Sequence, residues 1–219
     1  MDLQELAPPV LTSLKVSFIA SLIVFTLGSM AAWGMSKRRF AGKLLVETVF
    51  MLPLVLPPTV VGFILLVLLG KKSWIGRLAE AWGSVPIIFT WQAAVIASVV
   101  VAFPLVYQTA KSGFASVDRD LEDVARSMGA GEGQVLRLVT VPLAGRMLAT
   151  AYLLGFARGL GEFGATLMIA GNIPNKTQTL PTAIYLAVES GHTAEAWWWT
   201  GTMIVISFLM LLLVNGKKH

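Results

Sequence analysis

The sequence predicts an all-α integral membrane protein: a single domain, residues 1–219, built as a bundle of five, alternatively six, transmembrane helices. Hydrophobic residues make up 56% of the chain and charged residues only 13%, which is too apolar for an ordinary soluble domain. The apolar residues fall into runs long enough to cross a hydrocarbon core of about 30 Å, and most basic residues lie between these runs. The net charge of +5 therefore reflects membrane topology, and we expect no nucleic-acid partner.

The first predicted span covers residues 14–35 and the second covers residues 44–70. The short segment between them contains Lys37, Arg38, Arg39 and Lys43. Basic loops stay on the cytoplasmic side of a membrane, so we expect this segment in the cytoplasm and the N-terminus outside. Over all predicted loops, 11 Lys and Arg residues fall inside and 5 outside, which favours the same orientation and a cytoplasmic C-terminus.

Three prolines interrupt the second predicted span: Pro53, Pro57 and Pro58. Proline removes a backbone donor and clashes with the preceding helical turn, so the helix must be kinked or locally unwound there. Unwound backbone in a bilayer has to face protein or water. The segment around Pro57 and Pro58 therefore either lines the translocation path or makes a simple packing kink.

The third predicted span covers residues 86–108 and follows an external loop, Lys71 to Gly83. Ser84 is placed to cap this helix, with Pro86 in its first turn. The span returns the chain to the cytoplasm at a long polar segment, residues 111–142, which we expect to form a cytoplasmic loop.

Within that loop, residues 117–142 predict an amphipathic helical hairpin. Apolar residues recur at helical spacing on one side: Leu121, Val124, Met128, Val135 and Val139. Charged residues crowd the other side: Asp118, Arg119, Asp120, Glu122, Asp123 and Arg126. Gly129, Gly131 and Gly133 indicate a tight turn between two short helices, and we expect Pro142 to limit the second. A protruding hairpin of this kind is suited to a groove on another protein.

The fourth predicted span, residues 143–170, is rich in small residues that allow close helix approach: Gly155, Ala157, Gly159, Gly161, Gly164 and Ala165. Because five helices leave packing faces unpaired, we expect a homodimer with the pore on its twofold axis. Arg158 and Glu162 lie four residues apart and so share a helix face. Charges inside a membrane span are costly, so they either form a buried pair that fixes helix register or belong to a pathway or gate.

Residues 171–196 are too polar to span and are expected outside, with a short helix at 180–188 dipping toward the outer leaflet. The last predicted span covers residues 198–214. Trp197, Trp198 and Trp199 are expected at the outer membrane interface.

The hairpin motif resembles that of ABC importer permeases. Asp123-Val124-Ala125, then Gly129, then Val139-Thr140-Val141-Pro142 follow the spacing of the family pattern EAA, x3, G, x9, I-x-L-P, with Asp for Glu and Val for Ala. Residues 161–166 (GEFGAT), 170–172, 178–181 and 52–62 are similar to the molybdate permeases of this family. The resemblance implies an ABC importer permease fold whose coupling helix contacts a separate ATPase through Asp123, Val124, Ala125, Gly129, Val139 and Pro142.

The resemblance also implies the partners: two copies of this chain, two cytoplasmic ATPase subunits and an external molybdate-binding protein. ATP and Mg²⁺ would be used by the ATPase, and we expect no cofactor or metal on this chain. No GxxxxGK[ST] or GxSxG sequence occurs, so we expect no catalysis by this chain. For the path or gate, the candidates are Pro57, Pro58, Arg158, Glu162, Thr166 and Asn172, the last two as weak contacts for the oxyanion.

Two alternatives remain open. A sulfate or thiosulfate ABC permease would use the same mechanism on another oxyanion, and tungstate is a further possible substrate of a molybdate system. A secondary transporter coupled to an ion gradient would use its own intramembrane charges, although it would usually show an internal repeat, which this sequence lacks.

Overall fold

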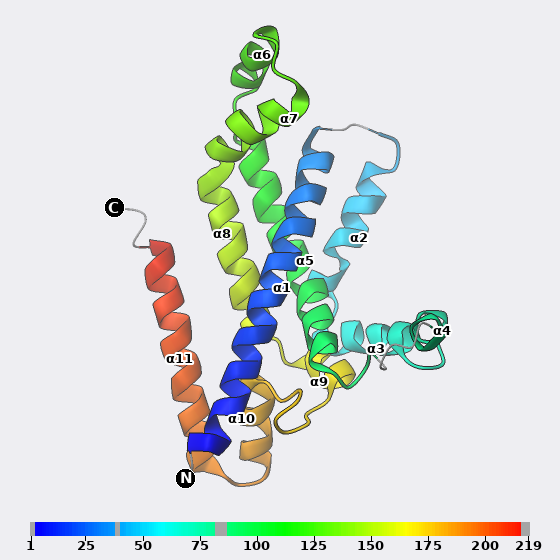
Figure 1. The fold of residues 1–219 in the computed structure, drawn as a ribbon, viewed down its shortest axis with the longest axis vertical. Helices are drawn as coiled ribbons and strands as arrows, with labels where there is room; N and C mark the ends of the chain where they lie inside the picture. The colour runs from blue at the N-terminus through cyan, green and yellow to red at the C-terminus, as the bar shows by residue number, and fades with distance from the viewer. Residues whose placement is uncertain (1–2, 38–39, 82–86, 216–219) are drawn as a thin grey trace.

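The computed structural model describes residues 3–37, 40–81 and 87–215, and in these ranges the regular structure is helical. Three long helices form the centre of the bundle: α1 (Leu3–Lys37), α5 (Trp91–Ala115) and α8 (Val141–Leu160). They run side by side along the long axis of the molecule (Figure 1). The predicted all-α membrane fold is confirmed.

By length and composition, four helical segments of the described residues can cross a membrane: Leu6–Lys37, Trp91–Ala115, Glu132–Leu160 and Thr193–Leu212. A fifth crossing is possible if the bent pair Lys43–Val55 and Pro58–Leu69 is counted as one broken span. The count agrees with the predicted five spans, but the boundaries differ. The first helix starts at Leu3 rather than near residue 14 and includes Pro8 and Pro9, because the predicted bounds marked only the apolar run and the helix extends into the residues before it.

The third span begins and ends later than predicted. Helix α5 starts at Trp91, and its cap is Thr90, whose Oγ1 accepts a hydrogen bond from the Ala93 amide at 3.3 Å. The expected cap, Ser84, and the expected first-turn proline, Pro86, lie outside the described residues. The helix continues to Ala115, well past residue 108.

The second span is broken where the prolines predicted it. Helix α2 (Lys43–Val55) and helix α3 (Pro58–Leu69) are bent by 113° at the break. Leu56 and Pro57 are extended, because a residue that precedes proline is pushed out of the helical region. Helix α3 therefore turns away from the long axis and projects to one side of the bundle together with a short helix, α4 (Trp74–Ala81) (Figure 1). The predicted loop at 71–83 thus contains a helix.

The fourth span, predicted as one run over 143–170, is two helices. Helix α8 ends at Leu160 and helix α9 (Gly164–Ala170) begins after a break of three residues, 161–163. The break has a local cause: a carboxylate oxygen of Glu162 accepts the Ala165 amide at 2.9 Å, so this side chain caps a new helix. The sequence pattern missed the break because the residues on both sides are helix-compatible.

The chain then forms α10 (Leu180–Glu189), which matches the short helix expected at 180–188, and α11 (Thr193–Asn215), which begins before the predicted residue 198. Trp199 is buried, and its Nε1 donates to the Leu6 carbonyl at 3.0 Å. The expectation that all three tryptophans mark the interface is therefore wrong for Trp199. Consecutive helical residues are about 100° apart, so three of them cannot share one face.

Candidate functional site

The predicted hairpin protrudes beyond the end of the central bundle (Figure 1). It consists of α6 (Arg119–Ser127), α7 (Glu132–Val135) and a π-helical turn, η1 (Leu136–Thr140). Asp118 caps α6 by accepting the Asp120 amide at 3.0 Å. Gly129 follows α6 with a φ of 91°, a left-handed conformation that favours glycine. The tight turn between two short helices is confirmed.

We expected Pro142 to end the second helix of the hairpin, but it does not. The helical path runs without a gap from Glu132 to Leu160, and Pro142 lies in the first turn of α8. The Val141 amide donates to the carbonyl of Leu136, five residues back, so the chain widens into a π turn immediately before the proline. A π adjustment of this kind accommodates the missing donor of proline without breaking the helix.

The hairpin carries an uncovered apolar face. Leu121, Val124 and Met128 are 49%, 58% and 83% exposed, respectively, although they recur at helical spacing. In contrast, Val135 is buried at the base of the hairpin. Exposed apolar residues on a helix that projects from a bundle have the character of a docking surface.

Five of the six motif residues lie on this one protrusion, and Pro142 follows it in the first turn of α8. Asp123, Val124, Gly129 and Pro142 are exposed, whereas Ala125 and Val139 are half-buried. Beside them, the Arg126 guanidinium bonds Glu132 at 2.6 Å and Asp123 at 2.5 Å. The hydrogen bond from Arg126 lowers the pKa of Glu132 and, reciprocally, the pKa of Arg126 is raised above its usual range by Glu132 and then Asp123. These bonds brace the turn of the hairpin.

Glu122 does not lie on the exposed charged side, where its spacing placed it. It is buried, and its carboxylate bonds Lys37 Nζ at 2.6 Å and Thr140 Oγ1 at 2.5 Å. Burial raises the pKa of this carboxyl, but the bonds from Lys37 and Thr140 outweigh burial and lower it overall. Sequence reasoning missed the role of Glu122 because its partners are 85 and 18 residues away along the chain.

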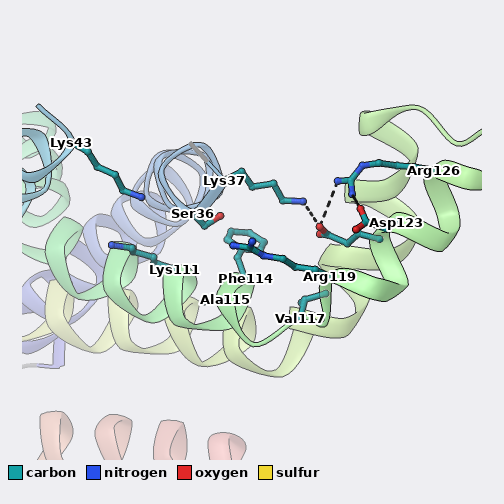
Figure 2. A pocket seen from close by; sticks show the side chains of 11 residues that line it. Ser36, Lys37, Lys43, Lys111, Phe114, Ala115, Val117, Arg119, Asp123 and Arg126 are labelled. Carbon is teal, nitrogen blue, oxygen red and sulfur yellow. Dashed lines mark hydrogen bonds and ion pairs between the residues drawn. The ribbon is translucent and has the colours of Figure 1, made fainter. Parts of the chain in front are cut away.

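A cavity of about 740 Å³ opens beside this carboxylate, between α1, α2, α5 and α6. Lys37 from α1 and Arg126 from α6 extend toward the same carboxylate from two sides of the cavity (Figure 2). Five basic residues line the cavity: Lys37, Lys43, Lys111, Arg119 and Arg126. The hairpin end of the molecule is therefore the basic end, as expected for the cytoplasmic side.

The two helix breaks meet where α9 packs on the start of α3. A Cβ built on Gly164 of α9 would lie 3.2 Å from the Pro58 Cβ and 3.3 Å from the Thr59 amide nitrogen of α3. Pro58 is half-buried in this contact, while Pro57 is exposed. The prolines of the second span and the break in the fourth span therefore form one junction, which sequence reasoning did not bring together.

The other predicted path residues lie around this junction. Arg158 bonds Glu162 at 2.7 Å, and the Glu162 side chain is 1% exposed against 32% for Arg158. Thr166 is buried, so in this conformation its hydroxyl is not open to a passing anion. Asn172 is half-buried, and its side-chain oxygen has no hydrogen-bond partner among the described residues.

The small residues of the fourth span are used mainly within the chain. A Cβ on Gly155 would lie 2.8 Å from the Val106 side chain of α5, and one on Gly159 would lie 3.7 Å from the Ser98 Cβ. Together with Gly164 against Pro58, these positions bring α8 and α9 close to their neighbours in the same chain. Ala157 and Gly161 of the same pattern are exposed, so the predicted second copy of the chain stays a prediction.

A membrane bundle with broken helices and a protruding motif hairpin defines the membrane subunit of an importer. Residues 24–215 match the family of binding-protein-dependent transport system inner membrane components, and the chain belongs to this family. It is 55% identical over 214 residues to YvgM of Bacillus subtilis (strain 168), named for a molybdenum transport system, covering 98% of this chain and 94% of that protein.

More distant relatives are also permease proteins of transport systems. The molybdenum transport system permease protein ModB of Escherichia coli (strain K12) is 41% identical over 181 residues, covering 83% of this chain and 79% of that one. The sulfate transport system permease protein CysT of Synechocystis sp. is 29% identical over 212 residues, covering 95% and 74%. In fold, the chain is similar to the MetNI methionine ABC transporter, with a TM-score of 0.72, 16% identity and coverage of 99% and 97%.

Proposed function

We propose that this chain is the permease subunit of an ATP-driven importer that carries molybdate across the cytoplasmic membrane. Tungstate is proposed as a further substrate of the same system. The observation that carries the substrate assignment is the 55% identity, over 98% of the chain, to a relative named for molybdenum transport. The sulfate relative is markedly less similar, at 29% identity. Uptake of sulfate is therefore the second candidate function.

Docking of the hairpin on a cytoplasmic ATPase is the second part of the proposal. The exposed apolar face of Leu121, Val124 and Met128 supports it, because such a face in water favours a protein partner. The motif residues Asp123, Ala125, Gly129, Val139 and Pro142 belong to the proposed docking region in and directly after the hairpin. The partner ATPase binds and hydrolyses ATP with Mg²⁺, and its closure moves the hairpin.

Two copies of the chain, two ATPase subunits and an external binding protein complete the proposed assembly. The family description supports the binding protein, since it names a binding-protein-dependent system. The orientation is proposed with the hairpin in the cytoplasm. In its support, α1 begins at the end of the bundle opposite the hairpin, while α11 runs back toward the hairpin end (Figure 1).

The junction of the two broken helices is the proposed translocation path or gate. Broken backbone is tolerated in a membrane only where it is buried in protein or faces a water-filled path, and both breaks meet here. Arg158 retains 32% of its side-chain surface exposed, so it is the charge available to a passing oxyanion. Pro57, Pro58, Glu162 and Thr166 belong to the two broken spans, and Asn172 follows α9 with a side-chain oxygen that has no hydrogen-bond partner among the described residues.

Uptake of labelled molybdate tests the proposal. The measurement uses membrane vesicles that contain this chain with its ATPase and binding protein, with ATP inside and excess unlabelled sulfate as competitor. ATP-dependent, saturable uptake that resists sulfate is the expected result. Uptake displaced by sulfate moves the assignment to the sulfate class, and uptake driven by a proton gradient without ATP contradicts the ABC mechanism.

A further inference from the structure

We infer that Glu122 is the positioning residue that ties the docking hairpin to α1, so that movement of the hairpin is passed to α1 through one buried carboxylate, which also braces the hairpin at the start of α8. The inference rests on the proposed docking of the hairpin on an ATPase, but it does not depend on which anion is imported.

The carboxylate joins three separate elements. It lies on α6, one oxygen bonds Lys37 in the last turn of α1 at 2.6 Å, and the other bonds Thr140 at the end of η1 at 2.5 Å. The guanidinium of Arg126 adds a longer contact at 3.6 Å from within α6. Bonds to an ionised group are short and directional, so the three elements are held in a defined relative orientation.

Val117, which precedes α6, is buried in the core of the central bundle, but α6 itself has few contacts with the bundle. Every residue of α6 is described, and Glu122 is the one that is buried. The close backbone approaches of α6 are mainly with α7 and η1, which belong to the same hairpin. A surface helix is ordinarily attached by a buried apolar stripe, but here Leu121 and Val124 face outward. The attachment of α6 to α1 therefore passes through a side-chain ion pair.

The two bonded sites are suited to receive a displacement. Lys37 is a cation in the last turn of α1, where the helix dipole favours positive charge. Thr140 lies in the π turn that leads directly into α8, and π turns often mark functional positions in helices. One carboxylate thus contacts the ends of two of the three central helices.

Variants at each of the three positions test the inference in the assembled complex with its ATPase. Glu122→Gln and Lys37→Met remove the ion pair, and Thr140→Val removes the hydroxyl donor. The quantity measured is anion imported per ATP hydrolysed, in vesicles with equal amounts of assembled complex. We expect this ratio to fall by about fivefold or more, while ATP hydrolysis continues within about twofold of the parent. Thr140→Ser, which keeps the hydroxyl, should retain the parental ratio.

Glu47→Gln is the matched control. Glu47 bonds Lys111 at 2.6 Å, as short as the pair under test, but it joins α2 to α5 and does not contact the hairpin. A parental ratio is expected for this variant. An equal loss in Glu47→Gln, or a parental ratio in Glu122→Gln, overturns the inference. A parallel loss of hydrolysis and import in Glu122→Gln also overturns it, because this reports general destabilisation rather than lost transmission.

A readout without substrate separates this inference from the proposed function. The chain has no cysteine, so spin labels can be attached at introduced cysteines, Ser127→Cys on α6 and Thr26→Cys on α1. Both positions are exposed, and labelled chain is diluted with unlabelled chain so that distances within one chain are read.

The distance between the labels at positions 127 and 26 should be the same in nucleotide-free and vanadate-trapped complexes of the parent. In Glu122→Gln this distance should differ between the two states. A distance that behaves identically in both contradicts the inference, whatever anion is imported. Failure of the ATPase to assemble with the parental chain contradicts the proposed docking instead.

Discussion

Gly62 of α3 packs directly on Ala165 of α9: a Cβ at position 62 would lie 2.8 Å from the Ala165 Cα, and equally close to the Met168 Cβ. This distance is shorter than real side chains allow. The contact therefore requires glycine, and it holds the two broken spans together at the proposed path.

We predict that Gly62→Ala destabilises the protein. The added methyl group has to displace backbone, and overpacking of this kind typically costs about 1–3 kcal/mol. Thermal unfolding in detergent should show a lower midpoint than the parent. Gly34→Ala is the control, because a Cβ at Gly34 meets no other atom within 4 Å and alanine favours a helix. An unchanged midpoint for Gly62→Ala would mean that α3 and α9 can separate without loss.

At the hairpin turn, we predict that Gly129→Val abolishes import while the chain stays in the membrane. The φ of 91° is strained for any side chain, at a cost of about 1–2 kcal/mol or more, although a Cβ there meets no atom within 4 Å. The effect should therefore come from the shape of the turn rather than from a clash. Import and ATPase co-purification are measured, with Gly133→Val as control, since Gly133 has no positive φ and no neighbour within 4 Å. Normal import by Gly129→Val would refute a role for the turn.

For the intramembrane pair, we predict that Arg158→Leu lowers stability more than the double variant Arg158→Leu with Glu162→Gln. The single change leaves a buried carboxylate without its cation. Breaking a fully buried pair in this way costs about 3–5 kcal/mol of stability, and the cost here should be smaller because Arg158 is partly exposed. Glutamine keeps an oxygen for the Ala165 amide, so the cap of α9 survives. Unfolding midpoints of the two variants give the comparison. Equal midpoints would show that Glu162 does not need Arg158 for its stability, and would favour a role for Arg158 in the path.

Attachment of the hairpin should depend on pH. The pKa of Glu122 is lower in the folded protein than its ordinary value of 4.5. A lowered folded-state pKa means that stabilisation is fully present above about pH 4.5 and is lost as the pH falls through the folded pKa. The protection factor of the Thr140 amide in hydrogen exchange should thus be high at neutral pH and should fall as the pH drops below 4.5 and through the folded pKa. In Glu122→Gln the fall in protection with acid should be absent, and its persistence would assign the effect to another group.

Much of the fold follows from local pattern. The apolar runs predicted the membrane spans, and Gly129 predicted the turn of the hairpin. Pro57 and Pro58 predicted the break between α2 and α3, whereas Pro53 lies inside α2 and does not interrupt it. Each of these depends on residues within one or two turns of helix. The motif that includes Asp123 and Pro142 also indicated the family, which the match over residues 24–215 confirms.

The roles of other residues could not be deduced from local pattern. At the break at 161–163, the Glu162 carboxylate accepts the Ala165 amide at the start of a new helix. The sequence pattern is equally compatible with one continuous helix. Similarly, Trp199 was predicted at the interface, but it packs inside because the start of α1 offers it a carbonyl 193 residues away.

The sequence by itself therefore determined the apolar spans, their order and the hairpin that protrudes from them, since each depends on the pattern of neighbouring residues. Only the tertiary structure decided which helices meet. It placed Gly62 against Ala165, and it buried Glu122 between Lys37 and Thr140. The physical reason is that helix periodicity specifies which side of a helix is apolar, whereas the partner of a buried polar group depends on distant residues brought together by packing.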